Sequence, residues 1–246
     1  MYAIYSFCRA VDDIADDVGA ADFGRIADLQ SWRDGTAALF HNEPTEKTAF
    51  LEPAVRRFGL REQDFLSVID GMEMDAQGAM VAPDLATLDR YCDCVASAVG
   101  RLSIKVFGMD EEPGFALAHH LGRALQLTNI LRDLDEDAEL GRLYLPREFL
   151  ETASLAGETP GRAIANPAID PVCRGVAELA ERRYREAEKI FQTRPRGDLR
   201  PPRLMGAVYG VMLSRMKKQG WTPPRQRMRL PKPMLIWLVL RHGLAG

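Results

Sequence analysis

Apolar residues along most of the chain recur every three or four positions, the period of an α-helix that is packed on one side. Two runs are long: residues 88–102, with Thr87 as N-cap and a stop signal at Gly108, and residues 115–134, which end near Gly141. Shorter runs predict helices over residues 24–40, 46–57, 62–77, 171–192 and 203–219. Alternating stretches of strand length are absent from the sequence, so the pattern predicts an all-α protein.

Two stretches rich in proline and basic residues interrupt this pattern near the end of the chain. Residues 194–202 read RPRGDLRPP and residues 222–233 read TPPRQRMRLPKP, which predicts two irregular connections. The sequence contains no repeat of solenoid length and no low-complexity tract. We therefore expect one helical domain over residues 1–246, with residues 194–246 as its basic C-terminal part.

Composition is that of a globular protein, with 46% hydrophobic and 27% charged residues among 246. The formal net charge of −3 hides an asymmetry. Residues 194–246 carry twelve Lys or Arg and one acid, Asp198, a balance of +11, which leaves residues 1–193 at −14. An acidic body with a basic tail suggests an anionic partner. The four cysteines include no C-x-x-C pair, which favours a reducing, cytoplasmic compartment.

The basic tail is predicted to meet a membrane surface rather than to cross a membrane or bind nucleic acid. The apolar run 234–240 is about a third of the ~20 residues that a membrane span requires, and Trp237 inside it suits an interface. The sequence has no P-loop, dinucleotide-binding or nucleic-acid-reading motif, and its first residues do not resemble a signal peptide. We expect peripheral contact with anionic lipid at the inner face of the cell membrane.

The first candidate site is the acidic run 12–17, which follows Arg9. On a helix Asp12 and Asp16 are one turn apart, so both carboxylates project from the same face and repel each other. A divalent cation removes that repulsion, and Mg²⁺ typically takes one or two carboxylates together with phosphate oxygens of a substrate. Taken alone, such a run is more typical of a solvated acidic face near a helix end.

A second polar stripe favours a metal site over a solvated acidic face. Asn129, Asp133 and Asp137 follow one another at four-residue steps on a predicted helix whose other faces are apolar. Polar groups beside apolar surface are costly unless something satisfies them. Arg9 and Arg132 stand next to the two clusters, and a guanidinium suits bidentate binding of an oxyanion. The two D-x-x-x-D helices, about 120 residues apart, are predicted to face each other across a bundle with metal ions between them.

The motifs DDIAD (12–16) and NILRDLDED (129–137), followed by GRLYLP (141–146), closely resemble those of the squalene/phytoene synthase family over nearly the whole chain. The resemblance implies an all-α isoprenoid synthase bundle with a central active-site cavity. Its two aspartate-rich helices hold Mg²⁺ (or Mn²⁺) and the diphosphates of two prenyl substrates. Within the family, DGMEMDA (70–76) and residues 91–108 and 230–244 are most similar to the bacterial branch that makes presqualene diphosphate for hopanoids.

The resemblance also implies roles for single residues. The family's metal-binding aspartates match Asp12, Asp16, Asp133 and Asp137, and its pocket-lining polar residues match Gln126 and Asn129. Its diphosphate-contacting arginines match Arg9 and Arg132, and its tyrosines around the reacting centre match Tyr5, Tyr91 and Tyr209. Family members carry an earlier helix, with serine and aromatic residues that fold over a diphosphate, so we expect the natural chain to start upstream of Met1.

The implied reaction condenses two farnesyl diphosphates without NADPH. Metal ions and arginines neutralise the leaving group of the first, and an apolar, aromatic pocket keeps water from the allylic cation. The 2,3 double bond of the second attacks that cation, and loss of a proton to Tyr91 or to the released diphosphate closes a cyclopropane. Two alternatives remain: a phytoene synthase acting on geranylgeranyl diphosphate, and a catalytically silent assembly protein. Enzymes of the hopanoid pathway are the expected protein partners.

Three other groups of polar residues are predicted to be structural. The histidines at 119–120 have no companion at metal-ligand spacing, and Asp70 and Glu73 share one predicted helix face. Cys92 and Cys94 fall within a helical pattern. We expect a helix-surface or core role for the histidines, a supporting role for the two acids and packing for the cysteines.

Overall fold

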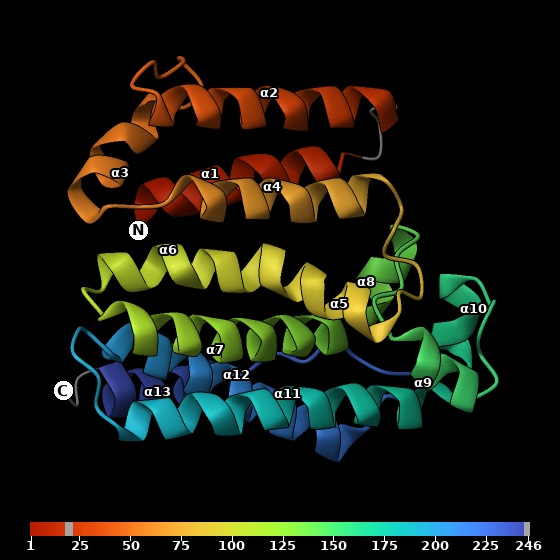
Figure 1. Ribbon diagram of the computed structural model, residues 1–246. Helices are drawn as coiled ribbons and strands as arrows, with labels where there is room; N and C mark the ends of the chain where they lie inside the picture. Colours follow the sequence, from red (N-terminus) through yellow and green to blue (C-terminus); the bar gives the residue numbers. More distant parts are fainter. Residues whose placement is uncertain (18–21, 244–246) are drawn as a thin grey trace.

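Helices make up most of the described structure, which covers residues 1–17 and 22–243 of a computed structural model (Figure 1). Within these ranges the one extended pairing is an isolated parallel bridge between Val81 and Leu143. The all-α prediction is therefore confirmed. None of the helices in the same ranges is both long and apolar enough to cross a bilayer.

The elements follow one another along the chain in a single series of helices and short helical turns. They are α1 (Tyr2–Ala15), α2 (Asp22–Phe40), η1 (Ala49–Leu51), α3 (Glu52–Phe58), α4 (Glu62–Ala76), α5 (Leu85–Cys92), η2 (Asp93–Ser97), α6 (Ala98–Val106), α7 (Glu111–Arg132), α8 (Leu134–Glu139), α9 (Arg147–Thr152), α10 (Pro160–Ala165), α11 (Ile169–Gln192), α12 (Arg200–Gln219) and α13 (Lys232–Gly243). In Figure 1 the long helices run roughly parallel, with α6 and α7 between α1, α2 and α4 on one side and α11 on the other.

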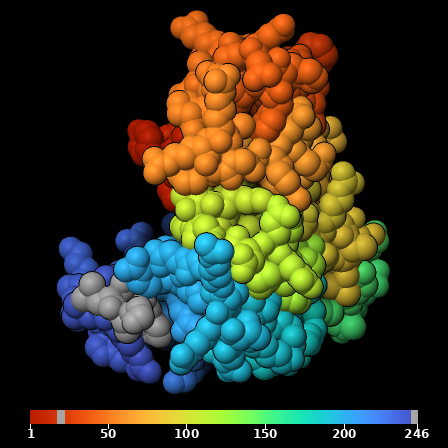
Figure 2. Space-filling model, turned by 60° about the vertical axis from the view of Figure 1, so that its left-hand side comes forward, coloured from red at the N-terminus to blue at the C-terminus, as the bar shows by residue number. Residues whose placement is uncertain are grey.

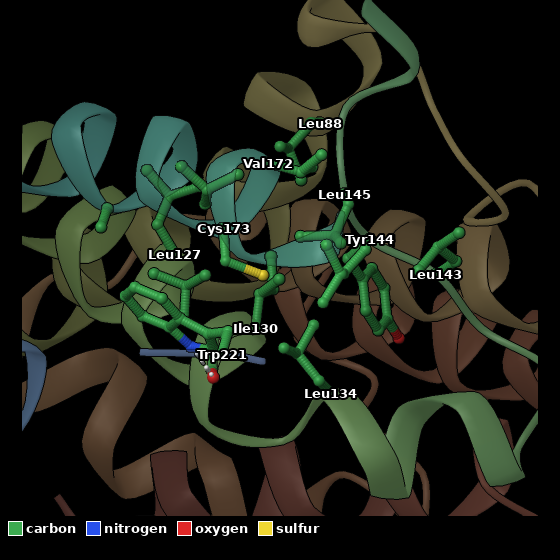
Figure 3. Close-up of a cluster of buried hydrophobic side chains, with 14 of the residues drawn as sticks. Leu88, Leu127, Ile130, Leu134, Leu143, Tyr144, Leu145, Val172, Cys173 and Trp221 are labelled. Carbon is green, nitrogen blue, oxygen red and sulfur yellow. Dashed lines mark hydrogen bonds between the residues drawn. The ribbon is translucent and has the colours of Figure 1, made fainter. Parts of the chain in front are cut away.

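Three hydrophobic clusters of the described residues hold these layers together, and two of them lie next to the predicted aspartates. One joins α1, α2, α4 and α6, and in it the Phe7 ring packs edge-on against Trp32 and Phe65 at centroid distances of 5.6 and 5.1 Å. The other joins α5, α7 and α11, and there Trp221 Nε1 donates to the Leu131 carbonyl over 3.0 Å (Figure 3). Full burial of one such aromatic side chain stabilises a fold by about 1.5–3 kcal/mol. These cores position the ends of α1 and α7, where the predicted aspartates lie.

Several predicted helix ends are wrong for local reasons. Thr87 is not the N-cap of α5: Asp84 is, because its side chain accepts the Thr87 N–H over 2.7 Å. The predicted helix 46–57 begins only at residue 49, as η1 and then α3. The irregular stretch 194–202 already contains the start of α12, because proline fits the first turn of a helix, where its missing N–H has no partner to lose.

The long helix predicted over 88–102 contains a π-helical turn, η2, between α5 and α6. The facing helix comes very close to this turn: a Cβ on Gly122 of α7 would approach Ser97 Cα to 2.7 Å. Only glycine therefore allows α7 and η2 to come this close. π-Helical turns are frequent at functional sites, and this one forms part of the wall of an apolar cavity.

Candidate active site

The first aspartate pair lies at the C-terminal end of α1. Ile4, Phe7, Val11 and Ala15 bury one side of this helix, which leaves Asp12 and Asp16 on another side. Asp16 is the C-cap and its backbone N–H donates to Asp12 O over 3.0 Å, so the two residues are one turn apart as predicted. Removal from bulk water and repulsion from Asp16 raise the pKa of the Asp12 carboxyl.

The second stripe runs across a break between two helices rather than along one helix, so the prediction of one helix to Gly141 is wrong. α7 ends at Arg132, Asp133 has φ −105° and ψ 17°, and α8 begins at Leu134. The α-helical backbone hydrogen bonds, from an N–H to the carbonyl four residues earlier, nevertheless continue across the break. Asp133 N–H donates to Asn129 O (2.9 Å), and Asp137 N–H donates to Asp133 O (2.8 Å). The stripe therefore keeps its helical spacing.

Arg142 brings the two clusters together. Its Nη1 donates to Asp16 Oδ1 over 2.6 Å and its Nη2 to Ala15 O over 2.9 Å, which ties the end of α1 to the segment after α8. Its Nε lies 4.0 Å from Asp75 Oδ1. The same guanidinium favours the charged forms of Asp12 and Asp137. Arg142 thus acts on both aspartate clusters, and the prediction that metal ions lie between them stays a prediction.

Asp137 lies close to several other carboxylates, Asp133, Asp75 and Glu136. Burial, followed by repulsion from Asp133, raises its pKa to about 7, although Arg142 acts in the opposite direction. No three His, Cys, Asp or Glu side chains of the described residues are close enough to enclose a metal ion by themselves. Mg²⁺ does not require such a cage, because it commonly combines one or two carboxylates with substrate phosphate and water.

Asn129 gives a direct indication that this site takes a ligand. Its Oδ1 is buried and, in the part of the chain that the structure describes, accepts no hydrogen bond, while its Nδ2 faces Gln126 Oε1 at 3.4 Å. An unpaired buried carbonyl oxygen costs about 1–3 kcal/mol. Oxygen is also the ligand type that Mg²⁺ prefers, so the donor set of Asn129 and the neighbouring aspartates fits that ion.

Asp133 is paired with two arginines. Arg132 Nε donates to its Oδ1 over 2.8 Å, and Arg227 Nε reaches the same oxygen over 2.8 Å. Arg227 also lies 3.2 Å from Glu136 Oε1, so the irregular segment between α12 and α13 covers the acidic end of the site. Arg132 further places its guanidinium 6.0 Å from the ring centre of Tyr209. Sequence reasoning found Arg132 but missed Arg227, which stands among many basic residues of the tail.

Asp75, like Arg142 and Arg227, is a residue that sequence reasoning missed. It is buried, and it accepts hydrogen bonds from Tyr91 Oη (2.8 Å, to Oδ2) and Tyr144 Oη (2.7 Å, to Oδ1). The two rings stack at 5.1 Å. Burial raises the pKa of Asp75 to about 6 and that of Tyr91 well above its usual value. An acid beside apolar Met72 and Ala76 on a helix was the available signal.

An apolar cavity of about 240 Å³ lies beside the polar cluster. Its walls come from η2 and α6, from α7 and from α12, and its polar lining residues include Gln126, Asn129 and Tyr209. Three of the residues predicted to surround the substrate therefore meet at one cavity. Tyr91 is absent from its lining.

Tyr5 and Arg9 are not among the residues that line this cavity. Tyr5 is 64% exposed, and Arg9 Nε forms an exposed ion pair with Asp13 Oδ1 at 3.0 Å. Their predicted roles stay predictions. The residues expected to be structural behave as such: Asp70 and Glu73 both bind Arg33, at 2.7 and 2.9 Å, and Cys92 and Cys94 are buried.

Two acidic helix ends that meet around a guanidinium, beside an apolar cavity in an all-α bundle, are the arrangement expected of a prenyltransferase of the isoprenoid synthase type. The chain belongs to the squalene/phytoene synthase family, whose profile matches residues 1–234. This confirms the family that the motifs indicated.

Individual relatives within the family show which of its members this chain is similar to. The chain is 54% identical to a presqualene diphosphate synthase of Zymomonas mobilis, over 98% of this chain and 82% of the relative. It is 46% identical to the presqualene diphosphate synthase of Rhodopseudomonas palustris, over 99% and 87%. Among solved structures, a squalene synthase from Alicyclobacillus acidocaldarius superimposes with a TM-score of 0.77 at 28% identity, covering 90% of this chain and 83% of the other.

Proposed function

We propose that this protein is a presqualene diphosphate synthase, which joins two farnesyl diphosphates with release of one diphosphate. The observation that carries the proposal is the convergence of Asp12, Asp16 and Asp137 around Arg142, next to an apolar cavity. The similarity to two relatives of that name supports the choice within the family.

Asp12 and Asp16 at the C-terminal end of α1, and Asn129 and Asp137 of the second stripe, are the residues that would hold Mg²⁺. Asp133, the fourth aspartate predicted as a ligand, is paired with Arg132 and Arg227 and would join them only on release from these arginines. Bound there, the ion would neutralise the charge that develops on a departing diphosphate. The protein's own cations, with Arg142 as the nearest to both clusters, add hydrogen bonds to the same oxygens. These groups are in place before the reaction, so the site needs little rearrangement to stabilise the leaving group.

The bond-breaking and bond-forming steps then take place in the apolar cavity. The C1–O bond of one farnesyl diphosphate breaks and its electron pair leaves with diphosphate. The 2,3 double bond of the second molecule attacks the allylic cation, and a proton is lost as the cyclopropane closes. Apolar walls exclude water from the cation, and the ring of Tyr209 can face positive carbon.

The sequence left two candidates for the group that accepts the proton, Tyr91 and the released diphosphate. Tyr91 donates its own hydroxyl proton to Asp75, its pKa is raised, and it does not line the cavity. We therefore favour diphosphate as the acceptor. Tyr91 and Tyr144 become positioning residues that hold Asp75 opposite Arg142.

The test is product identification. The purified protein is incubated with Mg²⁺ and either farnesyl or geranylgeranyl diphosphate, with and without NADPH, and the lipids are identified by mass spectrometry. Presqualene diphosphate from farnesyl diphosphate, unchanged by NADPH, is expected. Phytoene-type product from the longer substrate alone would support the phytoene synthase alternative. Absence of diphosphate release from both substrates would contradict the enzyme proposal and favour an assembly protein.

We also infer that residues 1–246 act as one domain at the inner face of the cell membrane, near the enzymes that consume its product. The substrate and product of the proposed reaction carry long isoprenoid chains, which partition into bilayers. An enzyme that collects and releases them gains from contact with a lipid surface.

A further inference from the structure

Helix α13 is apolar on two opposite sides. Leu238 faces inward and is 1% exposed, and it packs toward α12. The outward side carries Ile236, Trp237, Val239 and Leu240, which are 60%, 52%, 46% and 55% exposed. A helix that is apolar all round is normally covered on all sides. The outer face of α13 therefore lacks the cover that its composition calls for.

This face is continuous with a groove between α12 and α13. The groove has a volume of about 600 Å³, and Gly206, Gly210 and Ser214 of α12 lie along it opposite Trp237. In Figure 2 the dark-blue C-terminal region projects at a corner of the molecule. Contiguous apolar surface of this kind marks a binding surface for a protein or a membrane.

The cations around this surface identify the chemistry of its partner. Lys232 and Arg241 on α13 and Arg215 and Lys218 on α12 have no carboxylate within 4.0 Å among residues 1–17 and 22–243. The Arg241 guanidinium lies 5.0 Å from the centre of the Trp237 ring. A set of unneutralised cations at the edge of an apolar face complements an anionic, apolar partner.

Several other basic residues of the tail are paired with carboxylates. Arg225 binds Asp135 at 2.7 Å, Arg227 binds Asp133 at 2.7 Å, and Lys217 binds Glu181 at 2.6 Å. Part of the positive charge of residues 194–246 is thus held by carboxylates, two of which belong to the second acidic cluster. The four cations around α13 stay available to an external anion.

A second copy of this chain fits the surface poorly. In a two-fold contact the same patch meets itself, so the four cations of one copy would come close to the four cations of the other. A lipid surface satisfies both features, because acyl chains take apolar side chains and headgroup phosphates take lysine and arginine.

We propose that α13 lies in the surface of an anionic bilayer, with Ile236, Trp237, Val239 and Leu240 among the acyl chains. Lys232, Arg241, Arg215 and Lys218 then meet the headgroup phosphates. The inference deepens the proposed function and rests on it for the reason why a bilayer is useful. It places lipid one helix away from the cavity, because Met205 and Tyr209 on the other side of α12 line that cavity.

Vesicle flotation tests the surface without any substrate. The protein is mixed with vesicles of phosphatidylcholine alone or with added phosphatidylglycerol. Binding to the anionic vesicles only, weakened by salt, is expected. The double variant Ile236→Ser/Leu240→Ser should reduce binding at least about tenfold, since two large side chains no longer enter the bilayer. Phe23→Ser, which removes an 86% exposed aromatic on α2, is the matched control and should bind as the parent does.

Two further measurements separate the contribution of a cation, Lys218, from that of the Trp237 ring. Lys218→Gln should weaken binding to anionic vesicles about fivefold, the usual effect of one cation near such a surface. Trp32 and Trp221 are buried, so a blue shift of tryptophan emission on vesicle addition reports Trp237 and should vanish in Trp237→Phe. Turnover on detergent-solubilised farnesyl diphosphate is measured in parallel. Retained turnover with lost binding supports the lipid proposal and leaves the proposed function intact.

Three results would overturn the lipid proposal. They are equal binding to neutral and anionic vesicles, binding that the α13 variants do not change, and a dimer in sedimentation velocity that Ile236→Ser/Leu240→Ser dissociates while vesicle binding is absent. The last result would assign the face to a second copy. A chain that binds vesicles but releases no diphosphate in any condition would contradict the proposed function alone.

Discussion

Arg142 Nη1 donates a hydrogen bond to Asp16 Oδ1 across 2.6 Å, between residues 126 positions apart in the sequence. This contact joins the end of the first aspartate helix to the segment that follows the second cluster. Because Arg142 also faces Asp75 and favours the ionised form of Asp137, one side chain balances carboxylates from three helices. The geometry of the site therefore depends on it.

Arg142→Gln is expected to lower the free energy of unfolding by about 1–3 kcal/mol, since half-buried carboxylates lose a charged donor. Added Mg²⁺ should restore part of this loss, because a cation that binds only the folded state stabilises it. Urea unfolding with and without Mg²⁺ measures both effects. Arg147→Gln, which removes an exposed contact with Asp84 at 3.6 Å, should change stability by less than about 1 kcal/mol. Equal losses in the two variants would contradict the role of Arg142.

Asp12→Asn and Asp137→Asn should each lower turnover about a hundredfold or more, because each removes a carboxylate that would hold Mg²⁺. Mn²⁺ binding, followed by electron paramagnetic resonance without substrate, should weaken in parallel. Asp13→Asn is the matched control: its carboxylate lies next to Asp12 but pairs with Arg9 at the surface. Unchanged Mn²⁺ binding in both site variants would refute the metal assignment.

Tyr91→Phe distinguishes the two proton acceptors. Loss of its hydrogen bond to Asp75 should cost about 1–3 kcal/mol of stability, while turnover should fall by less than about tenfold if diphosphate takes the proton. Tyr184→Phe also removes a hydroxyl, one that is 3.0 Å from Thr128 Oγ1, and serves as control. A fall in turnover of about 10²–10⁴ in Tyr91→Phe alone would assign the proton to Tyr91.

Gly122→Ala should destabilise the protein by about 1–3 kcal/mol, because the new methyl group would meet the Ser97 backbone at 2.7–2.8 Å and displace η2. Since η2 forms part of the cavity wall, KM for the prenyl substrate should rise as well. Gly161 has free space where its Cβ would lie, so Gly161→Ala should leave both quantities close to those of the parent. Thermal unfolding and steady-state kinetics provide the comparison.

The lowered pKa of His119 predicts that the folded protein loses stability in acid. Burial, with the neighbouring Arg123 and Arg183, lowers its pKa to about 4, and its Nε2 lies 3.1 Å from Arg183 Nη1. In the unfolded chain histidine takes up a proton near pH ~6.5. The contribution of neutral His119 is therefore fully present above pH ~6.5 and is lost as the pH falls toward ~4.

His119→Gln keeps an acceptor for Arg183 but does not titrate in this range. Urea unfolding at pH ~7 and pH ~5 should show a smaller acid-induced loss in the variant than in the parent. His41→Gln replaces an exposed histidine that contacts only the local Ala37 carbonyl, at 2.8 Å, and should follow the parent. Parallel curves for all three proteins would remove His119 as the cause.

Short-range information in the sequence was sufficient for the helices and for the aspartate spacing. The period of apolar residues depends on contacts three or four positions apart, so α4, α11 and most of α12 could be predicted within a few residues. The same holds for Asp12 with Asp16 and for Asn129 with Asp133, whose relative placement follows from helix geometry. The aspartate motifs alone were specific enough to indicate the family.

Contacts between distant residues were beyond sequence reasoning. Asp75 becomes a site residue because Tyr144, 69 positions away, and Tyr91 donate to it. Arg227 joins the site because an irregular segment returns across 94 positions to Asp133. The close packing of η2 against α7 depends on a glycine of α7. Nothing in the local pattern encodes these approaches, which packing between helices determines.

The asymmetric charge of the chain shows which properties follow from the sequence and which require the tertiary structure. The sequence by itself determined that the tail is basic and that an apolar run lies within it. Only the tertiary structure decided which cations neutralise the aspartate site and which surround the exposed side of α13, because pairing depends on distances of a few ångströms between segments far apart in the chain.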